Sequence, residues 1–187
     1  YQSNYFPDSD PCHVAYTAAI QNPNSIAAQS YDVFFPTAPG GSTAKMSGAV
    51  VGMALNGVPI FGNFAAPGDD IYKEAETFDQ CGGHPQMSGA YHYHTEPHAI
   101  TFDDSRLVGV MRDGYPIYGR HDPDGSLPTL DEAGGHTGVT PDSPTTPVYH
   151  YHVHLETSTN PQSAGQQAWF ITTGTYHSSP AACTSCM

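Results

Sequence analysis

The sequence has 187 residues, of which 38% are hydrophobic and only 12% are charged. Eighteen acidic residues against five basic ones give a net charge of −13, which opposes binding to phosphate backbones and argues against a nucleic-acid partner. The longest apolar stretch, residues 49–61, is interrupted by Asn56, Gly57 and Pro59 and is shorter than the roughly 20 residues that span a bilayer. We therefore expect one folded domain without a membrane span, whose acidic surface either maintains solubility or attracts cations.

Two features predict a location outside the cytoplasm. The chain begins with Tyr1 rather than Met, as expected after removal of a signal peptide. Its four cysteines are an even number, which favours two structural disulfides in an oxidising compartment. They are Cys12, Cys81, Cys183 and Cys186. Three pairings are open, and we expect a secreted or cell-envelope protein.

The elements expected along the chain are short, because 19 glycines and 17 prolines interrupt it every few residues. Beta-rich segments are residues 31–35, 49–55, 107–111, 148–155 and 169–172. A short helix is expected over residues 70–78, where acidic side chains stand at the start. Turns are expected at Asn56-Gly57, Asp113-Gly114 and Asp124-Gly125, and polar loops over 138–147 and 158–167. The fold class is therefore mainly β, in one loop-rich domain with few short helices.

An internal repeat organises the chain. The sequence NGVPIFG (56–62) returns as DGYPIYG (113–119), FDQCGGH (78–84) returns as LDEAGGH (130–136), and YHYH (91–94) returns at 149–152. We divide the chain into an N-terminal extension packing on the core (1–45), a repeat domain (46–157) and a C-terminal extension with CxxC (158–187). Repeat A spans 46–101 and repeat B spans 103–157. We expect a pseudo-two-fold relation between the repeats, with matching strands side by side near the axis.

These combined motifs, from about Met46 to Glu156, resemble the YHYH domain family of secreted and envelope proteins. The resemblance implies an extracytoplasmic location and no settled activity. Cys81 matches the cysteine that usually precedes GGH in that family, whereas Ala133 departs from it. The departure implies that the second copy has lost either half of a disulfide or a ligand.

The YHYH tetrapeptide predicts a metal site. In an extended strand His92 and His94 share one face, and their Cα atoms are about 6.6 Å apart. Two imidazoles at that spacing can converge on one ion. The second copy supplies His150 and His152 in the same way. Pairing the two strands would bring four imidazoles to one face, so we expect a single His-rich site between the repeats.

The GGH block adds a third histidine to each copy. His84 and His136 follow two glycines, where the backbone can turn sharply. Each is a candidate third ligand, or a hydrogen-bond partner that orients a ligand. Asp79 and Asp131 precede them by five residues in both copies and are expected to orient these histidines through the free ring nitrogen.

Copper is the favoured metal and zinc the second, because imidazole-rich sites suit both and nearby tyrosines suit copper. Residues 121–126 contain Asp-x-Asp-Gly, a fragment of a calcium loop, but an Asp-stabilised turn explains it better. The sequence has no Gly-x-Ser-x-Gly, P-loop or HExxH motif, so we assign no catalytic residue. If the protein is an enzyme, metal-dependent oxidation or hydrolysis is the expected class.

The sequence therefore predicts an extracytoplasmic transition-metal binding protein. The alternative is a structural subunit of an extracellular assembly or adhesion protein, in which the Tyr and His side chains form the core and copies self-associate. For a polymer subunit we expect the terminal segments to pair with neighbouring copies.

Overall fold

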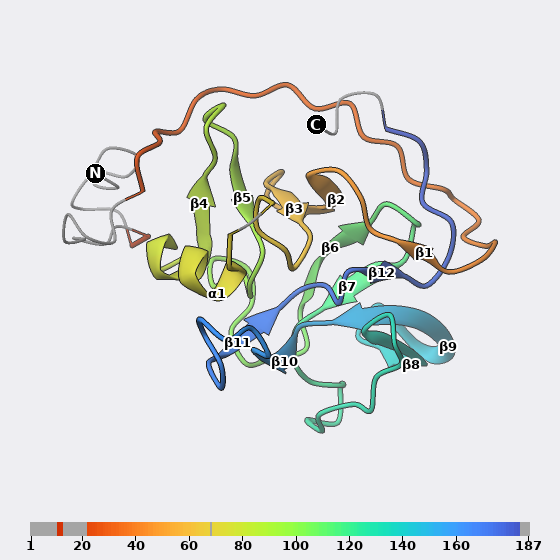
Figure 1. The fold of residues 1–187 in the computed structure, drawn as a ribbon. Helices are drawn as coiled ribbons and strands as arrows, with labels where there is room; N and C mark the ends of the chain where they lie inside the picture. The colour runs from red at the N-terminus through yellow and green to blue at the C-terminus, as the bar shows by residue number, and fades with distance from the viewer. Residues whose placement is uncertain (1–10, 13–21, 68, 184–187) are drawn as a thin grey trace.

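A computed structural model describes residues 11–12, 22–67 and 69–183. The fold is mainly β, with one short α-helix among these residues (Figure 1). The central sheet has eight strands in the order β4-β5-β3-β2-β6-β7-β9-β8. Their bounds are β2 Val50–Ala54, β3 Pro59–Phe61, β4 Gly83–Pro85, β5 Tyr91–Tyr93, β6 Leu107–Met111, β7 Pro116–Tyr118, β8 Gly135–Thr140 and β9 Ser143–His152.

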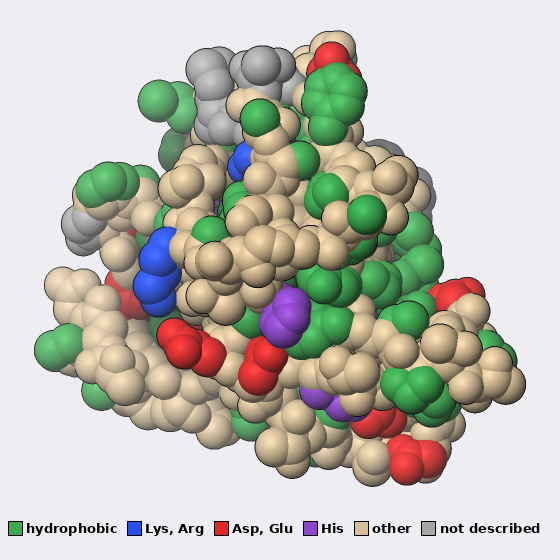
Figure 2. Space-filling model, turned by 90° about the vertical axis from the view of Figure 1, so that its right-hand side faces the viewer, with side chains coloured by type: hydrophobic (Ala, Val, Ile, Leu, Met, Phe, Trp, Pro, Cys, Tyr) green, Lys and Arg blue, Asp and Glu red, His purple; other side chains and the backbone are tan. Residues whose placement is uncertain are grey.

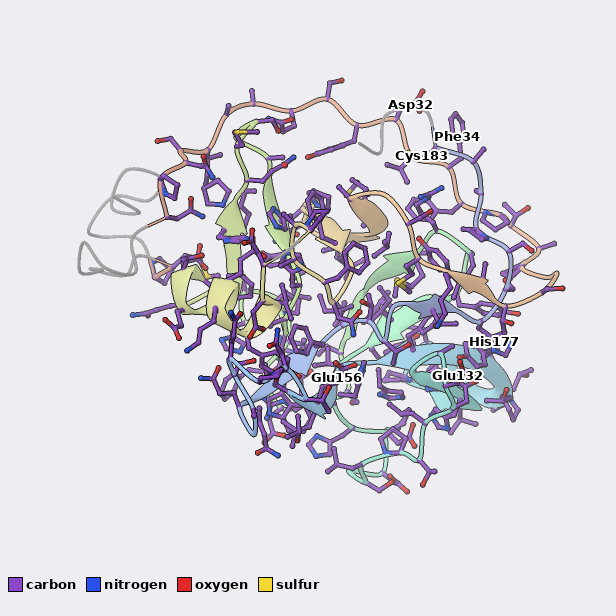
Figure 3. All side chains as sticks on the ribbon, in the orientation of Figure 1. Asp32, Phe34, Glu132, Glu156, His177 and Cys183 are labelled. Carbon is purple, nitrogen blue, oxygen red and sulfur yellow. A yellow bond between two sulfur atoms is a disulfide. The ribbon has the colours of Figure 1, made fainter. Side chains whose placement is uncertain are left out.

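Two small sheets complete the fold. β1 (Ala44–Lys45) pairs with β12 (Thr175–Tyr176), and β10 (His154–Thr157) pairs with β11 (Gln167–Phe170), both antiparallel. β1 and β12 come from the two extensions, so segments near the two ends of the chain pair with each other. Further out, Val33 forms a bridge with Cys183, and Figure 3 shows Asp32, Phe34 and Cys183 lying together at the periphery.

The strand pairing follows one scheme in both halves of the central sheet. β2 pairs antiparallel with β3, β3 parallel with β5, and β5 antiparallel with β4. β6, β7, β9 and β8 are connected in the same way. The two halves meet where β2 and β6 pair antiparallel. The two strands at the middle of the sheet, β2 and β6, therefore each precede the strand that carries the repeated Pro-Ile pair.

Turn and helix chemistry agree with the predictions from sequence. Gly57, Gly114 and Gly125 adopt φ values of 80°, 92° and 84°, the left-handed region that only glycine adopts without strain. α1 (Ile71–Glu74) continues into a 3-10 helix, η2 (Ala75–Thr77). Asp70 caps α1, because its side chain accepts a hydrogen bond from the Tyr72 N–H, as an N-cap residue does.

Two predictions about local structure are wrong. Residues 31–35 form no strand beyond the single bridge at Val33. Residues 138–147 are not a loop, since β8 and β9 continue through most of them as a hairpin. Pro144 and Pro147 suggest a loop in the sequence, but they stand in the exposed outer part of β9, where proline is tolerated.

The core lies on both sides of the β2–β6 junction. Val51, Ile60, Val108 and Ile117 are 0% exposed, and the second tyrosines of the YHYH segments, Tyr93 and Tyr151, belong to the same cluster. No helix among the described residues is long and apolar enough to cross a membrane. Figure 2 shows one face of the molecule, on which acidic side chains appear at several places and basic ones at few.

Candidate metal centres

The two YHYH segments do not form one site. β5 and β9 are separated by β3, β2, β6 and β7, so the predicted single site between the repeats is wrong. The reason is that each YHYH strand lies parallel to the PI strand of its own copy, with Ile60 opposite Tyr93 and Ile117 opposite Tyr151. The six predicted histidines instead form two clusters, three in each half of the sheet.

We call the first cluster site A; it consists of His84, His92 and His94. His84 lies directly opposite His92 in the β4–β5 pair, and His94 is two residues further along the same side of the chain. The Nε2 atom of His92 lies 3.0 Å from Nε2 of His84 and 2.9 Å from Nε2 of His94. All three side chains are at most 3% exposed.

The other ring nitrogen of each site A histidine is held in place. Nδ1 of His92 lies 3.0 Å from the carbonyl oxygen of Ala90, and Nδ1 of His94 lies 2.6 Å from that of Gly62. A carbonyl can only accept, so both Nδ1 atoms carry the hydrogen. Nδ1 of His84 lies 2.8 Å from the Thr77 hydroxyl and 3.2 Å from the amide nitrogen of the Asn22 side chain. The Nε2 lone pairs of His92 and His94 therefore point toward a common centre, which Nε2 of His84 also borders.

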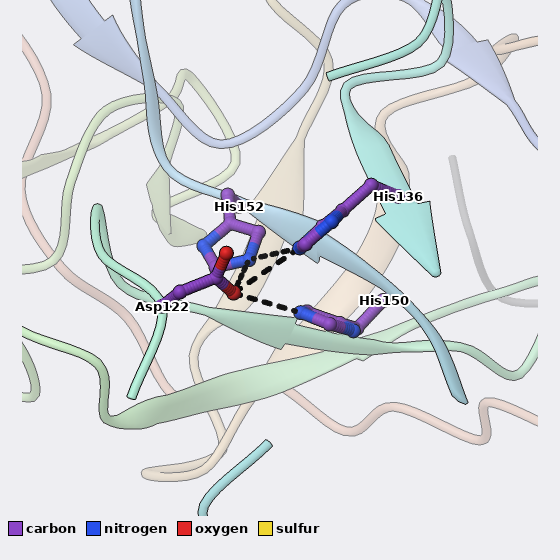
Figure 4. A group of neighbouring side chains, drawn as sticks. All are labelled: Asp122, His136, His150 and His152. Atoms are coloured by element: carbon purple, nitrogen blue, oxygen red, sulfur yellow. Dashed lines mark hydrogen bonds and ion pairs between the residues drawn. The ribbon is translucent and has the colours of Figure 1, made fainter. Parts of the chain in front are cut away.

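We call the second cluster site B; it consists of Asp122, His136, His150 and His152 (Figure 4). His136 lies opposite His150 in the β8–β9 pair. The Nε2 atoms of His136 and His152 are 3.3 Å apart. Asp122 Oδ1 is 3.2, 3.7 and 3.6 Å from Nε2 of His136, His150 and His152. One carboxylate oxygen thus faces three imidazole nitrogens.

The anchors of site B match those of site A. Nδ1 of His150 lies 2.9 Å from the carbonyl oxygen of Val148, two residues earlier. Nδ1 of His152 lies 2.7 Å from the carbonyl oxygen of Gly119, which ends the repeated DGYPIYG block as Gly62 ends the first. The geometry of the two clusters is therefore built by the same repeated segments.

Burial lowers the pKa of five of these imidazoles and keeps them neutral: those of His84, His92, His94, His150 and His152. It lowers the pKa of His84 to about 3 and those of His94 and His152 to about 4. The pKa values of His92 and His150 are also lowered, mainly by burial. Neutral imidazole is the form that coordinates a metal.

The separation of the nitrogens suits a metal ion. Tetrahedral zinc with bonds of about 2.0–2.1 Å would hold its ligand nitrogens about 3.4 Å apart, close to the distances at both sites.

The YHYH protein family model matches residues 34–128, half of the chain. The chain belongs to the YHYH protein family. No curated protein and no solved structure matches it.

The hydroxyl groups of the YHYH tyrosines bond to groups outside the two histidine clusters. Tyr91 donates to Asp79 and Tyr149 to Asp131, both aspartates of the block that ends in GGH. Tyr151 donates to Asp113 of the DGYPIYG block. In the first copy the direction reverses, because Asn56 of the matching block donates to Tyr93 Oη at 3.0 Å. The hydroxyl groups of these tyrosines therefore bond to the aspartates and to Asn56 and do not join the histidine clusters.

The predicted role of Asp79 and Asp131 is wrong. Neither carboxylate contacts the histidine five residues later; besides its tyrosine, Asp79 accepts from the backbone N–H groups of Cys81 and Gly83. Asp131 does the same with Ala133 and Gly135. These aspartates fix the turn before each GGH histidine, since a backbone N–H needs an acceptor when it is buried.

The GG pair in each block has a packing reason. Gly82 and Gly134 adopt φ values of 87° and 85°. A Cβ at Gly83 would lie 2.5 Å from Cζ of Tyr91, and one at Gly135 would lie 2.5 Å from Oη of Tyr149. The first glycine therefore allows the turn, and the second leaves room for the ring of the first YHYH tyrosine. The hydroxyl of that tyrosine donates a hydrogen bond to Asp79 in the first copy and to Asp131 in the second.

Sequence reasoning missed two acidic residues. Asp122 was read as part of a turn or calcium-loop fragment, and the turn is there, with Asp124 accepting from Ser126 N–H and hydroxyl. The neighbouring Asp122 side chain instead faces the three histidines of site B. Glu74 ends α1, and its Oε1 lies 3.6 Å from His84 Nε2. Burial, followed by the charge of Asp69, raises the pKa of Glu74 to about 7.

Site A also borders a cavity of about 760 Å³. Its lining includes all three site A histidines, Glu74 and several apolar side chains: Ala49, Phe61, Phe64, Ala65, Pro85 and Met87. The space beside Asp122 at site B is smaller, about 470 Å³. Site A is thus deeply buried on the sheet side and open on the cavity side.

The cysteine before GGH belongs to a disulfide rather than to a metal site. Cys81 is bonded to Cys12, which ties the chain near the N-terminus to the turn before His84. Cys183 is also disulfide-bonded, while Cys186 and Tyr1 lie outside the described residues. Ala133 therefore stands where the first sequence copy has one half of a disulfide.

Proposed function

We propose that this protein binds two transition-metal ions, one at site A through His84, His92 and His94 and one at site B through His136, His150, His152 and Asp122. The observation that carries the proposal is the convergence of the Nε2 atoms at each site, with the Nδ1 hydrogens of four of the histidines held by carbonyl oxygens: His92, His94, His150 and His152. Converging lone pairs repel one another, and a cation at their centre would replace that repulsion with coordination. Oriented, buried imidazoles of this kind are typical of metal ligands.

Copper is the metal we propose, with zinc as the alternative. Imidazole nitrogen suits both ions, and copper(II) binds such donors most tightly among the divalent first-row metals. Calcium is a poor match to either cluster, because calcium takes six to eight oxygen ligands. The net charge of −13 would attract any of these cations. Storage, capture or redox chemistry of the metal are all roles that such a protein can have.

We place the protein in the secreted or envelope compartment. The Cys12–Cys81 disulfide supports that proposal, since disulfides persist in oxidising compartments. We also propose that the two copies are related by a pseudo-two-fold between β2 and β6, on the strength of the matching strand connections and of the matching anchors at Gly62 and Gly119.

The experiment that tests the metal proposal is elemental analysis of untagged protein purified without added metal, combined with unfolding in the presence and absence of a chelator. We expect near-stoichiometric copper or zinc, and a lower midpoint of unfolding with chelator because the ion stabilises the folded state by mass action. No bound metal, and unfolding that ignores both chelator and added copper or zinc, would overturn the proposal.

The alternative function is a structural subunit of an extracellular assembly. The burial of Tyr93 and Tyr151 in the core supports it, because YHYH segments then have a packing role without a metal. Pairing of β1 with β12 and of Val33 with Cys183 inside one chain weighs against the need for a neighbouring copy at those edges. Measurement of the native mass in solution separates the two functions, since a metal-binding monomer stays near 20.0 kDa.

A further inference from the structure

The two sites differ at one position of a corresponding loop. At each site a glycine carbonyl oxygen holds Nδ1 of the second YHYH histidine, that of Gly62 at site A and that of Gly119 at site B. Three residues after Gly119 stands Asp122, whose Oδ1 faces the three imidazoles of site B. Three residues after Gly62 stands Ala65. An alanine side chain has no donor atom, so the loop that adds a carboxylate to site B adds none to site A.

The cavity beside site A provides room for an external ligand. Within the described part of the chain, the converging ligand atoms of site A are three imidazole nitrogens. Ala65 and these three histidines line the same cavity of about 760 Å³. A metal centre with three protein ligands keeps a fourth position for an external molecule, whereas four protein ligands close a structural site. A metal ion at site A would therefore have its free position on the cavity side.

The charge of the site indicates the group that fills this position. Histidine coordinates as the neutral imidazole, so a divalent ion at site A keeps both positive charges, and an uncompensated buried charge is costly. At site B the Asp122 carboxylate compensates one of them. Glu74 lies to one side of site A, with Oε1 3.6 Å from Nε2 of His84. A bound monocarboxylate would leave the ion, the ligand and Glu74 together neutral or singly positive, whether Glu74 is ionised or protonated.

The walls of the cavity indicate the rest of the ligand. Apolar side chains in the lining include Phe61, Phe64, Pro85 and Met87. Phe61 stacks on the His92 ring at 3.9 Å between centroids, so an apolar surface lies directly against one of the proposed ligands. Apolar walls around a few polar groups are typical of small-molecule sites, and a hydrocarbon body gains free energy by leaving water for such walls.

We propose that site A is a ligand-binding metal centre whose fourth position takes the carboxylate of a small apolar monocarboxylate from solution. The carboxylate takes the place that Asp122 has at site B, and the hydrocarbon body lies against Phe61 and Phe64. This inference rests on the proposed metal binding at site A. Site B takes no such ligand, because Asp122 fills the corresponding position.

The test uses the full chain with Co²⁺ at both sites, because the visible absorption of this ion reports its ligands. Bands present in the wild type and absent from His92→Ala belong to site A. Benzoate is the probe. Benzyl alcohol has the same ring without the carboxylate, and acetate has the carboxylate without the ring, so the two together separate the contributions of head group and body.

We expect benzoate to shift the site A bands saturably and to leave the remaining bands unchanged. Acetate should bind at site A about 10-fold more weakly, because it leaves the apolar walls uncovered. Benzyl alcohol should also bind about 10-fold more weakly or less, because a neutral hydroxyl does not compensate the charge of the ion.

Exchanging the loop residues tests the position of the ligand. Ala65→Asp gives site A the carboxylate that it lacks and should abolish the response to benzoate. Ala99→Asp is the charge-matched control, since Ala99 is exposed and does not line the cavity, and it should respond as the wild type does. Asp122→Ala, studied with enough cobalt to fill both sites, should make the site B bands sensitive to acetate.

Site A bands that benzoate does not alter, or alters equally in Ala65→Asp, would overturn the inference while leaving metal binding intact. Benzyl alcohol or acetate binding as tightly as benzoate would overturn the ligand class. If Ala65→Asp does not fold, Asp122→Ala decides, and cobalt bands at site B that acetate leaves unchanged would overturn the inference. A wild-type spectrum equal to that of His92→Ala would mean that no metal binds at site A, and the proposed function would then fail there together with this inference.

Discussion

Sites A and B are assembled by the same repeated segments but differ in their fourth group. In both, the GGH histidine lies opposite the first histidine of YHYH, and the second histidine is anchored on a glycine carbonyl. At site B, Asp122 faces all three imidazoles, and its side chain is 20% exposed. At site A the corresponding space is a cavity with Glu74 at its border. The repeated motifs thus position three imidazole nitrogens at each site. The loop after the repeated Pro-Ile strand adds a carboxylate, Asp122, at site B only.

The same contrast runs through the surroundings of the two sites. Copy A is tied to the N-terminal region by Cys12–Cys81, while copy B has Ala133 at the matching position. Copy B instead places a charged acceptor, Asp113, under the second tyrosine, where copy A has Asn56. One copy therefore has a covalent link to the N-terminal region, and the other has a buried carboxylate that accepts hydrogen bonds from Tyr151 and the Ser178 N–H.

The largest effect is expected from removing the disulfide. Its loop spans a sequence separation of 69 residues, so replacing both Cys12 and Cys81 with Ala should cost about 4 kcal/mol of unfolding free energy in the chain-entropy account. Urea unfolding measures it. Because Cys81 adjoins the turn before His84, metal affinity should fall at site A and stay unchanged at site B; equal losses at both sites would refute this local coupling.

Removing the fourth ligand should separate the two sites. Asp122→Asn should weaken metal binding at site B about 100-fold, or about 2.7 kcal/mol, since a charged ligand is lost. Glu74→Gln should change metal affinity at site A less than 3-fold, because Glu74 lies beside the three nitrogens. Competition with a chelator of known affinity measures both. Asp124→Asn, in the same loop as Asp122, is the control; an equal effect from it would contradict the assignment of Asp122.

The second tyrosines should differ in their contribution to stability. Tyr151→Phe leaves the buried Asp113 carboxylate without its hydroxyl donor, which should cost about 2 kcal/mol. Tyr93→Phe removes only the bond from the neutral Asn56 amide and should cost about 1 kcal/mol. Chemical unfolding of the metal-free proteins gives both values. A larger loss for Tyr93→Phe would reverse the comparison.

The buried histidines should make the metal-free protein sensitive to acid. The folded-state pKa of His84 is about 3, below the unfolded value of about 6.5, so the unfolded chain takes up the proton first. The stability is present above about pH 6.5 and is lost as pH falls toward 3. His84→Gln should reduce the slope of stability against pH by up to about 1.4 kcal/mol per pH unit in that window.

Urea unfolding of the metal-free wild type and of His84→Gln between about pH 4 and 6.5 measures this slope. An unchanged slope in His84→Gln would mean that burial of this imidazole does not govern acid stability.

Much of the site could be predicted from the sequence. Alternation of side chains along a strand placed His92 with His94 and His150 with His152 on one face, and all six predicted histidines lie in the two clusters. The positive φ of Gly57 and Gly114 and the start of the helix at Asp70 followed from local chemistry. These features depend on residues close together in the chain.

The rest depended on strand order, which alternation does not encode. In the fold β5 pairs with β3, with Ile60 opposite Tyr93, and not with β9, so one site was predicted where there are two clusters. Asp122 precedes His136 by 14 residues. Its Asp-x-Asp-Gly context predicts a turn, which the structure contains, and gives no sign that the Asp122 side chain faces the histidines. Asp79 and Asp131 were assigned to the histidines, because the sequence does not reveal that a tyrosine and two N–H groups occupy each carboxylate.

The most direct test of two separate metal sites is metal stoichiometry in three variants. We predict two equivalents per chain in the wild type, one in His92→Ala, one in His150→Ala and none in the double variant. A far-ultraviolet spectrum confirms that each variant is folded. Loss of all metal from either single variant, with the fold retained, would mean one shared site and would contradict the account; so would a folded wild type that binds no metal at all.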